Sequence, residues 1–275
     1  MKSSVSGFHE LNADEKLELI KKFTDLTDEE QELLRKTGAL DINKAEMMIE
    51  NVIGTTEYPI GIATNFLING RDYLIPMALE EPSVVAAASY SAKLARPRGG
   101  FVADADEPVM IGQIQLVGIK DLKEAKKNVL LKKEEIFDVA NKCDSVLVQF
   151  GGGVRDIEVR EFETSRGNMI VVHLLVDVRD AMGANAVNTM CERVAPLLEE
   201  ATGGQKRLRI ISNLADKRLA RSKAVWTKDD LGEEVIEKIL DAYELAVNDQ
   251  YRCTTHNKGA MNGIDAVVLA TANDF

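Results

Sequence analysis

The sequence predicts an α+β protein in which a smaller domain is inserted into a larger helical and mixed domain. Amphipathic helical patterns lie near both ends of the chain, and the middle shows the order β-α-β-β-α-β. That order is typical of a ferredoxin-like domain. Because the sequence has no G-x-G-x-x-G fingerprint, a Rossmann domain is not indicated. We expect the larger domain at residues 1–107 and 214–275 and the ferredoxin-like domain at 108–213.

The composition indicates a globular chain with an acidic balance. Of its 275 residues 45% are hydrophobic and 29% charged, and the net charge is −11. This argues against nucleic acid or an anionic membrane as a partner, because either needs a basic face. The three cysteines form no CxxC pair, which fits a reducing compartment, and no metal site is expected. Without a signal peptide or an apolar run of ~20 residues, we expect a soluble cytoplasmic protein.

The N-terminal region predicts amphipathic helices. Residues 6–36 alternate charged side chains with apolar ones at helical spacing, and Asn12 or Asp14 can cap the first helix. A further helix is expected over Lys44–Gly54, with Gly54 as its C-cap. The charged faces of these helices are expected to be solvated.

A hairpin and a helix follow. Ile60–Ile68 and Tyr73–Met77 are expected to form strands around an Asn69-Gly70 turn, which is a strong hairpin signal. The segment Glu80-Glu81-Pro82-Ser83 then opens a run of small residues, Val84–Ala92. Two carboxylates and a serine at the start of an apolar helix fit two interpretations. They could form a functional site, or they could be ordinary features of a helix start with Pro82 in the first turn. The local sequence favours the helix start.

The inserted domain is predicted from consecutive patterns of alternating and helical periodicity. Two of its strands are joined by a turn at Ser165-Arg166-Gly167. A further amphipathic helix, Glu233–Leu245, follows the domain. The expected elements of the domain are strand Val109–Val117, helix Leu122–Asn141, strands Ile157–Glu163 and Met169–Asp177, helix Ala184–Glu200 and strand Leu208–Ser212.

Two loops of this domain contain glycines beside charged residues. One is Asp144–Gly153, and the other is Asp180–Asn188, where a helix begins. The free N–H groups and positive end of a helix suit a pyrophosphate, and Gly183 permits close approach. The alternative is that Asp180 caps the helix and that Gly183 is present because a larger side chain would not fit there. Taken alone, the loop favours that alternative.

The last stretch, Arg252–Phe275, places Lys258 among small and polar residues. A lysine in such a setting needs a carboxylate or hydrogen-bonding partner, or it loses its proton. Asp274 is the candidate partner, but a straight helix would separate the two by about 24 Å. They can meet only if the chain bends between them or if one comes from a second subunit. The alternative is a buried salt bridge that has no catalytic role.

Seven motifs occur together in one order along the chain. Together they resemble hydroxymethylglutaryl-CoA reductase, in particular its second class, the soluble bacterial and archaeal form, from about residue 8 to the last residue. The motifs are ENVIG at Glu50–Gly54, EEPS at Glu80–Ser83, GGGVRDIEV at Gly151–Val159, DVRDAMGANAVNTM at Asp177–Met190, SNLAD at Ser212–Asp216, THNKGAMNGID at Thr255–Asp265 and ND at Asn273-Asp274.

The resemblance implies a reaction and its catalytic residues. A thioester is reduced to an alcohol in two hydride transfers, which gives mevalonate and coenzyme A. By position, Lys258 polarises the substrate carbonyl and stabilises the oxyanion. Glu81 donates a proton to the aldehyde-level oxygen, a task that favours a raised pKa. Asp274 tunes both groups, and Asn213 completes the hydrogen bonding around Lys258.

The resemblance also implies binding residues and partners. Ser83, Arg252 and Asn262 match positions that hold the acyl substrate. Asp144 matches a position near the adenosine ribose, where a carboxylate repels a 2′-phosphate, so NADH is favoured and NADPH is possible. ENVIG lies at a subunit interface in the family, so a homodimer is expected. The inserted domain is the expected NAD(P)-binding domain, with Asp180, Met182, Gly183, Ala184, Asn185 and Asn188 at the cofactor.

Two features depart from the family pattern. Lys217 lies in the loop from which the first class takes its catalytic lysine, although THNKG favours Lys258. The family's catalytic histidine lies well beyond Asp274, and none of the chain's histidines matches it, so the chain looks truncated. The alternatives are therefore a catalytically incomplete dinucleotide- or acyl-CoA-binding fragment, or a different NAD-dependent oxidoreductase. The chain's histidines are His9, His173 and His256.

Overall fold

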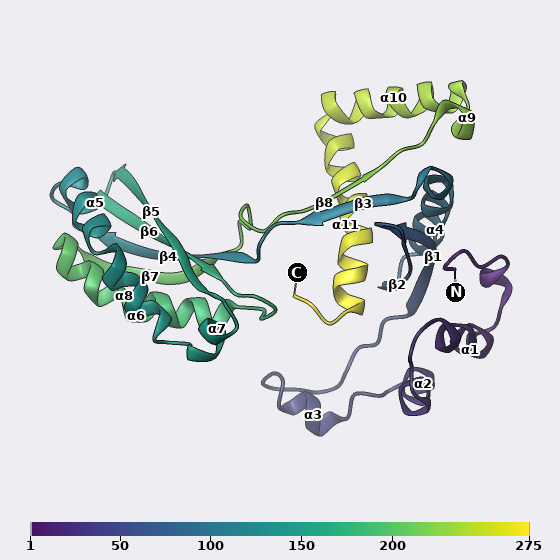
Figure 1. Cartoon of the computed structure of the whole chain (residues 1–275), viewed down its shortest axis with the longest axis horizontal. Helices are drawn as coiled ribbons and strands as arrows, with labels where there is room; N and C mark the ends of the chain where they lie inside the picture. Colours follow the sequence, from purple (N-terminus) through teal and green to yellow (C-terminus); the bar gives the residue numbers. More distant parts are fainter. Residues whose placement is uncertain (1, 275) are drawn as a thin grey trace. The chain divides into compact units, whose positions relative to one another are not determined.

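The computed structural model describes residues 2–274, which form two compact units. The inserted unit is Asp104–Arg221, and the outer unit consists of the described residues on either side of it. The expected inserted domain, 108–213, lies within the inserted unit. Both units belong to a mixed α and β architecture with two four-stranded sheets, ordered β2-β1-β3-β8 and β5-β6-β4-β7 (Figure 1).

The outer unit begins with short helices, the first α-helix of which has the predicted cap. The 3-10 helix η1 is Phe8–Glu10, and α1 and α2 are Ala13–Phe23 and Asp28–Arg35. The cap at Asn12 is confirmed: its side chain accepts the Glu15 N–H at 2.9 Å, and the Glu15 carboxylate accepts the Asn12 N–H at 2.8 Å.

The expected helix ending at Gly54 is wrong. Helix α3 covers only Ile42–Glu46, and Asn51 has a left-handed φ of 58°. Beyond Glu46 the side chains of Met47, Met48 and Ile49 are exposed, so no packed apolar face supports further helical turns.

The hairpin prediction is confirmed. Strands β1 (Ile60–Ile68) and β2 (Arg71–Ala78) pair antiparallel. Asn69 and Gly70 both have positive φ, 50° and 77°, as a type I′ turn requires. The remaining elements of the outer unit are α4 Val84–Ala95, 3-10 helix η2 Arg96–Arg98, α9 Lys228–Leu231, α10 Glu233–Asn248 and α11 Gln250–Ala270. Strands β3 (Phe101–Ala105) and β8 (Ala220–Ala224) contain the boundaries between the two units.

The inserted unit shows the expected order of elements with one helix divided. The predicted helix Leu122–Asn141 is two helices that meet at Lys132, and the predicted loop after Asp144 contains a short helix. Neighbouring strands pair antiparallel throughout the sheet. Its elements are β4 Val109–Val117, α5 Leu122–Leu131, α6 Lys133–Asn141, α7 Ser145–Gln149, β5 Gly153–Thr164, β6 Gly167–Asp177, α8 Ala184–Thr202 and β7 Gln205–Ser212.

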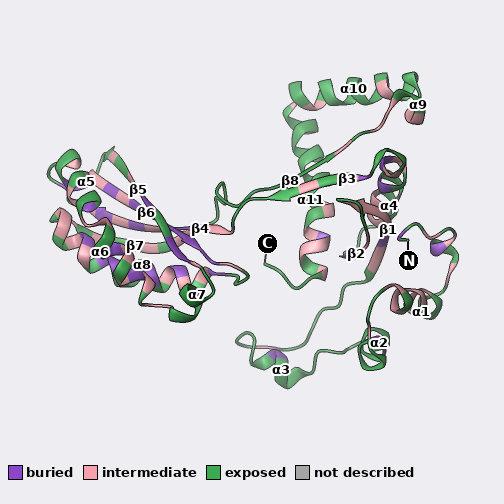
Figure 2. Ribbon diagram, in the orientation of Figure 1, coloured by how far each residue is buried: buried purple, intermediate pink, exposed green. Residues whose placement is uncertain are grey.

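The core of the inserted unit lies between its sheet and helices α5, α6 and α8. Ile114 and Leu116 of β4 are fully buried there, while Gln113 and Gln115 alternate to the other face. Met190 and Leu198 of α8 fill the facing positions. Figure 2 shows this continuous buried layer, whereas α10 and α11 of the outer unit are largely exposed. The inserted unit is therefore the better-packed part of the described chain.

Candidate active site

A loop and a helix of the outer unit bring together three of the predicted site residues. Glu81 lies between β2 and α4, whereas Lys258 and Asn262 lie one turn apart on α11. The Lys258 ammonium donates to Glu81 Oε2 at 2.7 Å, and the Asn262 side-chain amide donates to the same oxygen at 2.9 Å. Among residues 2–274, Oε1 of Glu81 accepts no hydrogen bond, so it remains open to a ligand.

Small side chains hold α11 against the hairpin. Ala266 is 3% exposed and packs in a core with Ala63 of β1 and Met77 of β2. Because Ala266 follows Asn262 by four residues, it lies on the helix face that carries Asn262 and Lys258. The placement of Lys258 opposite Glu81 therefore depends on a close contact between α11 and the hairpin.

The ion pair determines the charge of Glu81. The hydrogen bond from Lys258, followed by the charge of that lysine, holds the pKa of Glu81 below its usual range. The expectation of a raised pKa is thus wrong for this arrangement, because the side chain is 46% exposed and paired with a cation. Glu81 is an anion near neutral pH, and proton donation would require Lys258 to turn to another acceptor.

Ser83 adopts a strained conformation at the start of α4. It occupies the N-cap position with a left-handed φ of 74°, and its side chain makes no capping hydrogen bond. Pro82 precedes the helix and does not lie in its first turn. The helix start predicted for this segment is therefore confirmed, whereas the placement of Pro82 in the first turn is wrong. A non-glycine residue with positive φ is uncommon and is often found at functional sites.

Two further predicted residues of the outer unit, Arg252 and Asp274, lie before and after Lys258 along the chain. Arg252 lies six residues before Lys258, so its side chain leaves α11 on a face turned by roughly 120°. The helix is unbroken from Lys258 to Ala270, a length of about 18 Å. A bend before Ala270 is thus excluded as a way for Asp274 to approach Lys258. A contribution from a second subunit stays a prediction.

The rival lysine has a different partner. Lys217 and Asn213 lie in the exposed loop after β7, in the inserted unit. The Lys217 ammonium is 3.1 Å from Glu158 Oε1 of β5, and this hydrogen bond raises the pKa of Lys217. The carboxylate that pairs with Lys258 is a predicted site residue, whereas the one that pairs with Lys217 is not. The geometry therefore favours Lys258, and the role of Asn213 stays a prediction.

Asp144 caps the short helix α7. Its carboxylate oxygen Oδ1 accepts the Leu147 N–H at 2.8 Å, and the residue is half-buried. One oxygen is thus engaged in the fold, and Oδ2 is left to accept from a ribose hydroxyl. The structural role and the predicted binding role are compatible.

The loop before α8 is shaped by Gly183. This residue is the N-cap, with φ 95°, and a Cβ there would lie 2.5 Å from Met110 Sδ and 2.7 Å from Val178 Cγ1. The packing explanation for Gly183 is confirmed, and the expected capping by Asp180 is wrong. Asn188 accepts the Ile211 N–H at 2.9 Å, which ties α8 to β7. Of the other predicted residues, Asp180, Met182 and Asn185 are exposed and Ala184 is half-buried.

Sequence reasoning missed a charged cluster between the two glycine-bearing loops. Asp177 is fully buried at the end of β6, where Arg155 and Arg179 both reach its Oδ2, at 2.7 Å and 2.6 Å. These three residues lie in two of the motifs, but no role was predicted for any of them. The apolar character of β6 could have revealed the cluster, because the strand is buried over its last six residues and a carboxylate at its end requires a cationic partner.

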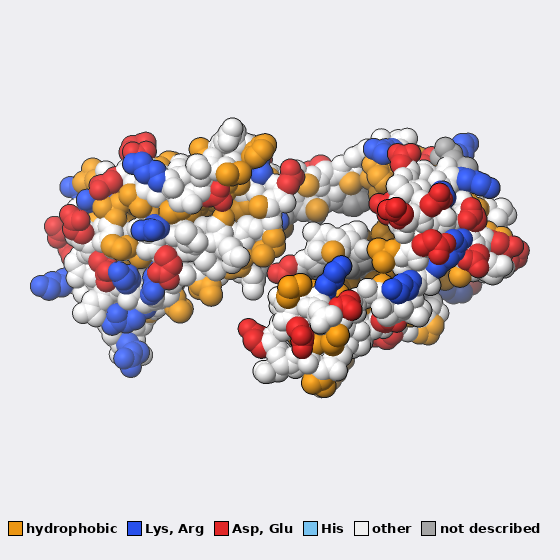
Figure 3. Space-filling model, turned by 90° about the horizontal axis from the view of Figure 1, so that it is seen from below, with side chains coloured by type: hydrophobic (Ala, Val, Ile, Leu, Met, Phe, Trp, Pro, Cys, Tyr) orange, Lys and Arg blue, Asp and Glu red, His pale blue; other side chains and the backbone are white. Residues whose placement is uncertain are grey.

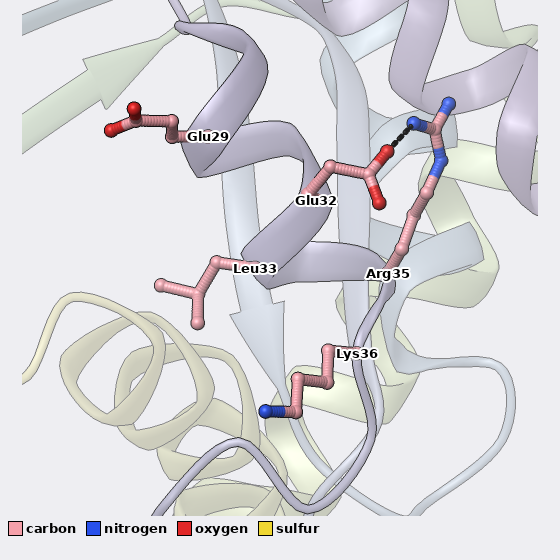
Figure 4. Close-up of a pocket in the computed structure, with 5 residues that line it drawn as sticks. All are labelled: Glu29, Glu32, Leu33, Arg35 and Lys36. Atoms are coloured by element: carbon pink, nitrogen blue, oxygen red, sulfur yellow. Dashed lines mark hydrogen bonds and ion pairs between the residues drawn. The ribbon is translucent and has the colours of Figure 1, made fainter.

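A surface hollow on the N-terminal helices is separate from these residues. It is lined by Glu29, Glu32, Leu33, Arg35 and Lys36, and Glu32 pairs with Arg35 at 2.6 Å (Figure 4). None of the predicted site residues lines it.

Among residues 2–274, the helices lack the length and apolar character that a membrane span requires.

Sequence comparison identifies relatives along nearly the whole chain. The profile of the family described as hydroxymethylglutaryl-coenzyme A reductase matches residues 12–275. The 3-hydroxy-3-methylglutaryl-coenzyme A reductase of Archaeoglobus fulgidus is 57% identical over 276 residues, which cover 100% of this chain and 63% of the relative. A probable reductase of this kind from Borreliella burgdorferi is 34% identical, over 82% of this chain and 53% of its own length. The chain therefore spans less than two thirds of either relative.

Solved structures show the same fold. A 3-hydroxy-3-methylglutaryl-coenzyme A reductase of Streptococcus pneumoniae superposes with a TM-score of 0.93 at 39% sequence identity, over 98% of this chain and 74% of that chain. A second structure with the same values is described as the class II enzyme from Streptococcus pneumoniae bound to NADPH in open conformations.

Proposed function

Because the chain belongs to the hydroxymethylglutaryl-coenzyme A reductase family, we propose that it converts hydroxymethylglutaryl-CoA to mevalonate and coenzyme A, or catalyses the reverse oxidation. The observation that carries this proposal is the cluster of Glu81, Lys258 and Asn262, within the region that the family profile matches. The NADPH named for the Streptococcus pneumoniae structure supports a nicotinamide dinucleotide as the source of hydride.

Lys258 is the group best placed to stabilise charge at the substrate carbonyl. When a thioester or aldehyde carbonyl accepts hydride, negative charge develops on its oxygen. The Lys258 side chain is 64% exposed, and its ammonium has further N–H donors beyond the one given to Glu81. A fixed cation aimed at an oxyanion is usually the largest single catalytic contribution.

Glu81 and Asn262 complete the chemistry at this oxygen. A carbonyl oxygen that draws the Lys258 ammonium away from Glu81 removes the main cause of the low pKa of Glu81. The carboxylate then takes up a proton more readily and can pass it to the aldehyde-level oxygen. Asn262, which donates to Oε2, keeps Glu81 in place during that exchange. We assign Asp274 and Asn213 to the same network.

Substrate recognition is assigned to Ser83 and Arg252 together with Asn262. The hydroxyl of Ser83 is exposed and does not cap α4, so it can bind the acyl group. Arg252 offers a planar fork that suits the substrate carboxylate. Its position on another face of α11 requires that it act on a substrate held by a second subunit, or that the substrate extend around the helix.

The inserted unit is proposed as a ferredoxin-like cofactor domain. Its strand order β5-β6-β4-β7, with antiparallel pairs and helices joining the strands, supports that assignment. The nicotinamide dinucleotide would supply the two hydrides. Asp144 would bind the adenosine ribose, which favours NADH over NADPH, and the exposed loop at Asp180–Asn185 would bind the diphosphate with Asn188 behind it.

A homodimer is proposed from the exposed apolar side chains of the outer unit. Ile53 is fully exposed and Met47 is 80% exposed, and the outward face of α10 adds apolar residues at helical spacing. In the view from below, hydrophobic side chains lie on the surface between acidic and basic ones (Figure 3). We assign Ile53, Met47 and the apolar residues of α10 to the subunit interface, where a partner would cover them. The α10 residues are Val235, Ile239, Tyr243 and Val247.

Sedimentation of an Ile53→Glu variant tests the dimer. We expect the wild-type chain to sediment as a dimer and the variant as a monomer, because a buried carboxylate without a partner opposes association. Leu131→Glu, at a 74% exposed position on α5, is the matched control and is expected to leave the dimer intact. A folded wild-type monomer at micromolar concentration would contradict the proposal.

The activity is tested by NADH or NADPH oxidation that depends on hydroxymethylglutaryl-CoA, with mevalonate identified as the product. The reverse direction is tested with mevalonate, coenzyme A and the oxidised dinucleotide. Binding of dinucleotide and acyl-CoA without turnover would instead support a binding fragment. Turnover with other acyl substrates only would support a different oxidoreductase. The expected cytoplasmic location stays a prediction.

A further inference from the structure

The inserted unit holds an unusual excess of positive charge around one buried carboxylate. Asp177 is 0% exposed, and Arg155 and Arg179 both bind its Oδ2. Both guanidinium groups also donate to the Gly151 carbonyl, at 2.7 Å from Arg155 and 2.9 Å from Arg179. Two cations thus share one anion and one carbonyl oxygen, and the cluster keeps a net charge of +1 in a chain whose net charge is −11.

The two arginines retain unused hydrogen-bond donors. Arg155 uses Nε and Nη2, and Arg179 also uses Nε and Nη2. Each guanidinium has five N–H donors, and Nη1 of each accounts for two. Among residues 2–274, neither Nη1 has a partner, and the two side chains are 41% and 37% exposed. Nη1 of both groups is therefore available to a ligand.

The backbone segments around the cluster pack closely against one another. A Cβ at Gly152 would lie 2.7 Å from the Asp177 carbonyl oxygen, so only glycine fits there. Arg179 has a left-handed φ of 50°, and its N–H donates to Asp177 Oδ1 at 3.0 Å. Asp177 therefore fixes both guanidinium groups and the turn that leads to α8. Gly151 ends the segment capped by Asp144, so the cluster joins the two loops assigned to the cofactor.

We propose that Arg155 and Arg179 bind the diphosphate of the dinucleotide, and that Asp177 is the positioning residue that holds them. This inference rests on the proposed function only in naming the dinucleotide as the ligand. Nη1 of each arginine offers two N–H donors to phosphate oxygens, and a diphosphate provides enough negative charge for both arginines. The buried carboxylate prevents the arginines from separating, while the excess charge draws the anion.

Calorimetric titration with ADP and with adenosine tests the proposal. ADP contains the diphosphate, and adenosine presents the same base and ribose without it. We expect Arg155→Gln and Arg179→Gln each to weaken ADP binding by about 10- to 100-fold, the range for hydrogen bonds to charged groups, and to leave adenosine binding unchanged. Arg160→Gln is the matched control, because Arg160 lies on the same strand, where it stacks on Phe162, and should leave ADP binding unchanged.

Further readouts separate this inference from a purely structural role. Inorganic pyrophosphate should compete with ADP for the wild-type chain and not for the Arg155→Gln/Arg179→Gln double variant. If the arginines only hold the loops together, ADP and adenosine affinities will fall together, or neither will change, and the proposal is overturned. These measurements need no turnover, so a chain that binds ADP in this way but does not reduce hydroxymethylglutaryl-CoA would overturn the proposed function alone.

Discussion

Replacing Lys258 by methionine is expected to lower turnover of hydroxymethylglutaryl-CoA by about 10²- to 10³-fold, the usual loss when one donor to an oxyanion is removed. Methionine retains a long, flexible side chain but has no positive charge. The Lys258 side chain is exposed and its ion pair with Glu81 lies at the surface, so its removal should change folding stability little. The measurement is dinucleotide oxidation in the presence of saturating acyl-CoA.

The same variant offers a readout at Glu81. Because the Lys258 hydrogen bond is the largest cause of the low pKa of Glu81, its loss should raise that pKa toward the ordinary carboxyl value, as NMR titration would show. Lys238→Met is a matched control, since Lys238 also forms an exposed ion pair, at 2.6 Å from Glu234. Equal loss of activity in Lys238→Met, or full activity in Lys258→Met with loss only in Lys217→Met, would contradict the assignment.

The elements with strong local signals could be predicted from the sequence. Strand β4 has the predicted bounds, Val109–Val117, because its side chains alternate between a buried and a less buried face. The hairpin follows from Asn69-Gly70, whose residues tolerate positive φ. Asp274 was the predicted partner of Lys258, and the placement of Glu81 in the same site was reached by a different route. It came from motifs shared with a family, since no local pattern connects residues 177 positions apart.

Features that depend on distant contacts could not be predicted. Helix α3 ends at Glu46 because its following apolar side chains find no packing surface within this chain, which the helical pattern alone does not reveal. Lys132 separates α5 from α6 although the sequence reads as one helix. The low pKa of Glu81 likewise reflects a partner from another element. Local periodicity predicts where helices and strands lie. The pKa values of side chains and the ends of helices depend on residues that are distant in sequence.

The buried carboxylate at Asp177 is expected to be the most important single charge for the stability of the inserted unit. Asp177→Asn should lower the free energy of unfolding by about 3 kcal/mol, the low end of the range for breaking a buried ion pair, because both arginines remain partly exposed. Burial by itself raises the pKa of Asp177, but the bonds from Arg155 and Arg179 outweigh it and hold the pKa below the ordinary value.

The sign of the pH dependence follows from that lowered pKa. A carboxylate with a lower pKa in the folded state stabilises the fold above its unfolded pKa, about 3.9, and loses this contribution as the pH falls through the folded value. The stability difference between the wild-type chain and Asp177→Asn should therefore be constant near neutral pH and shrink below about pH 4. Urea unfolding at several pH values measures this difference. Asp156→Asn is the control, since Asp156 pairs with Lys133 on the surface and should cost less than about 1 kcal/mol. An equal cost for the two substitutions would show that the buried cluster does not stabilise the unit.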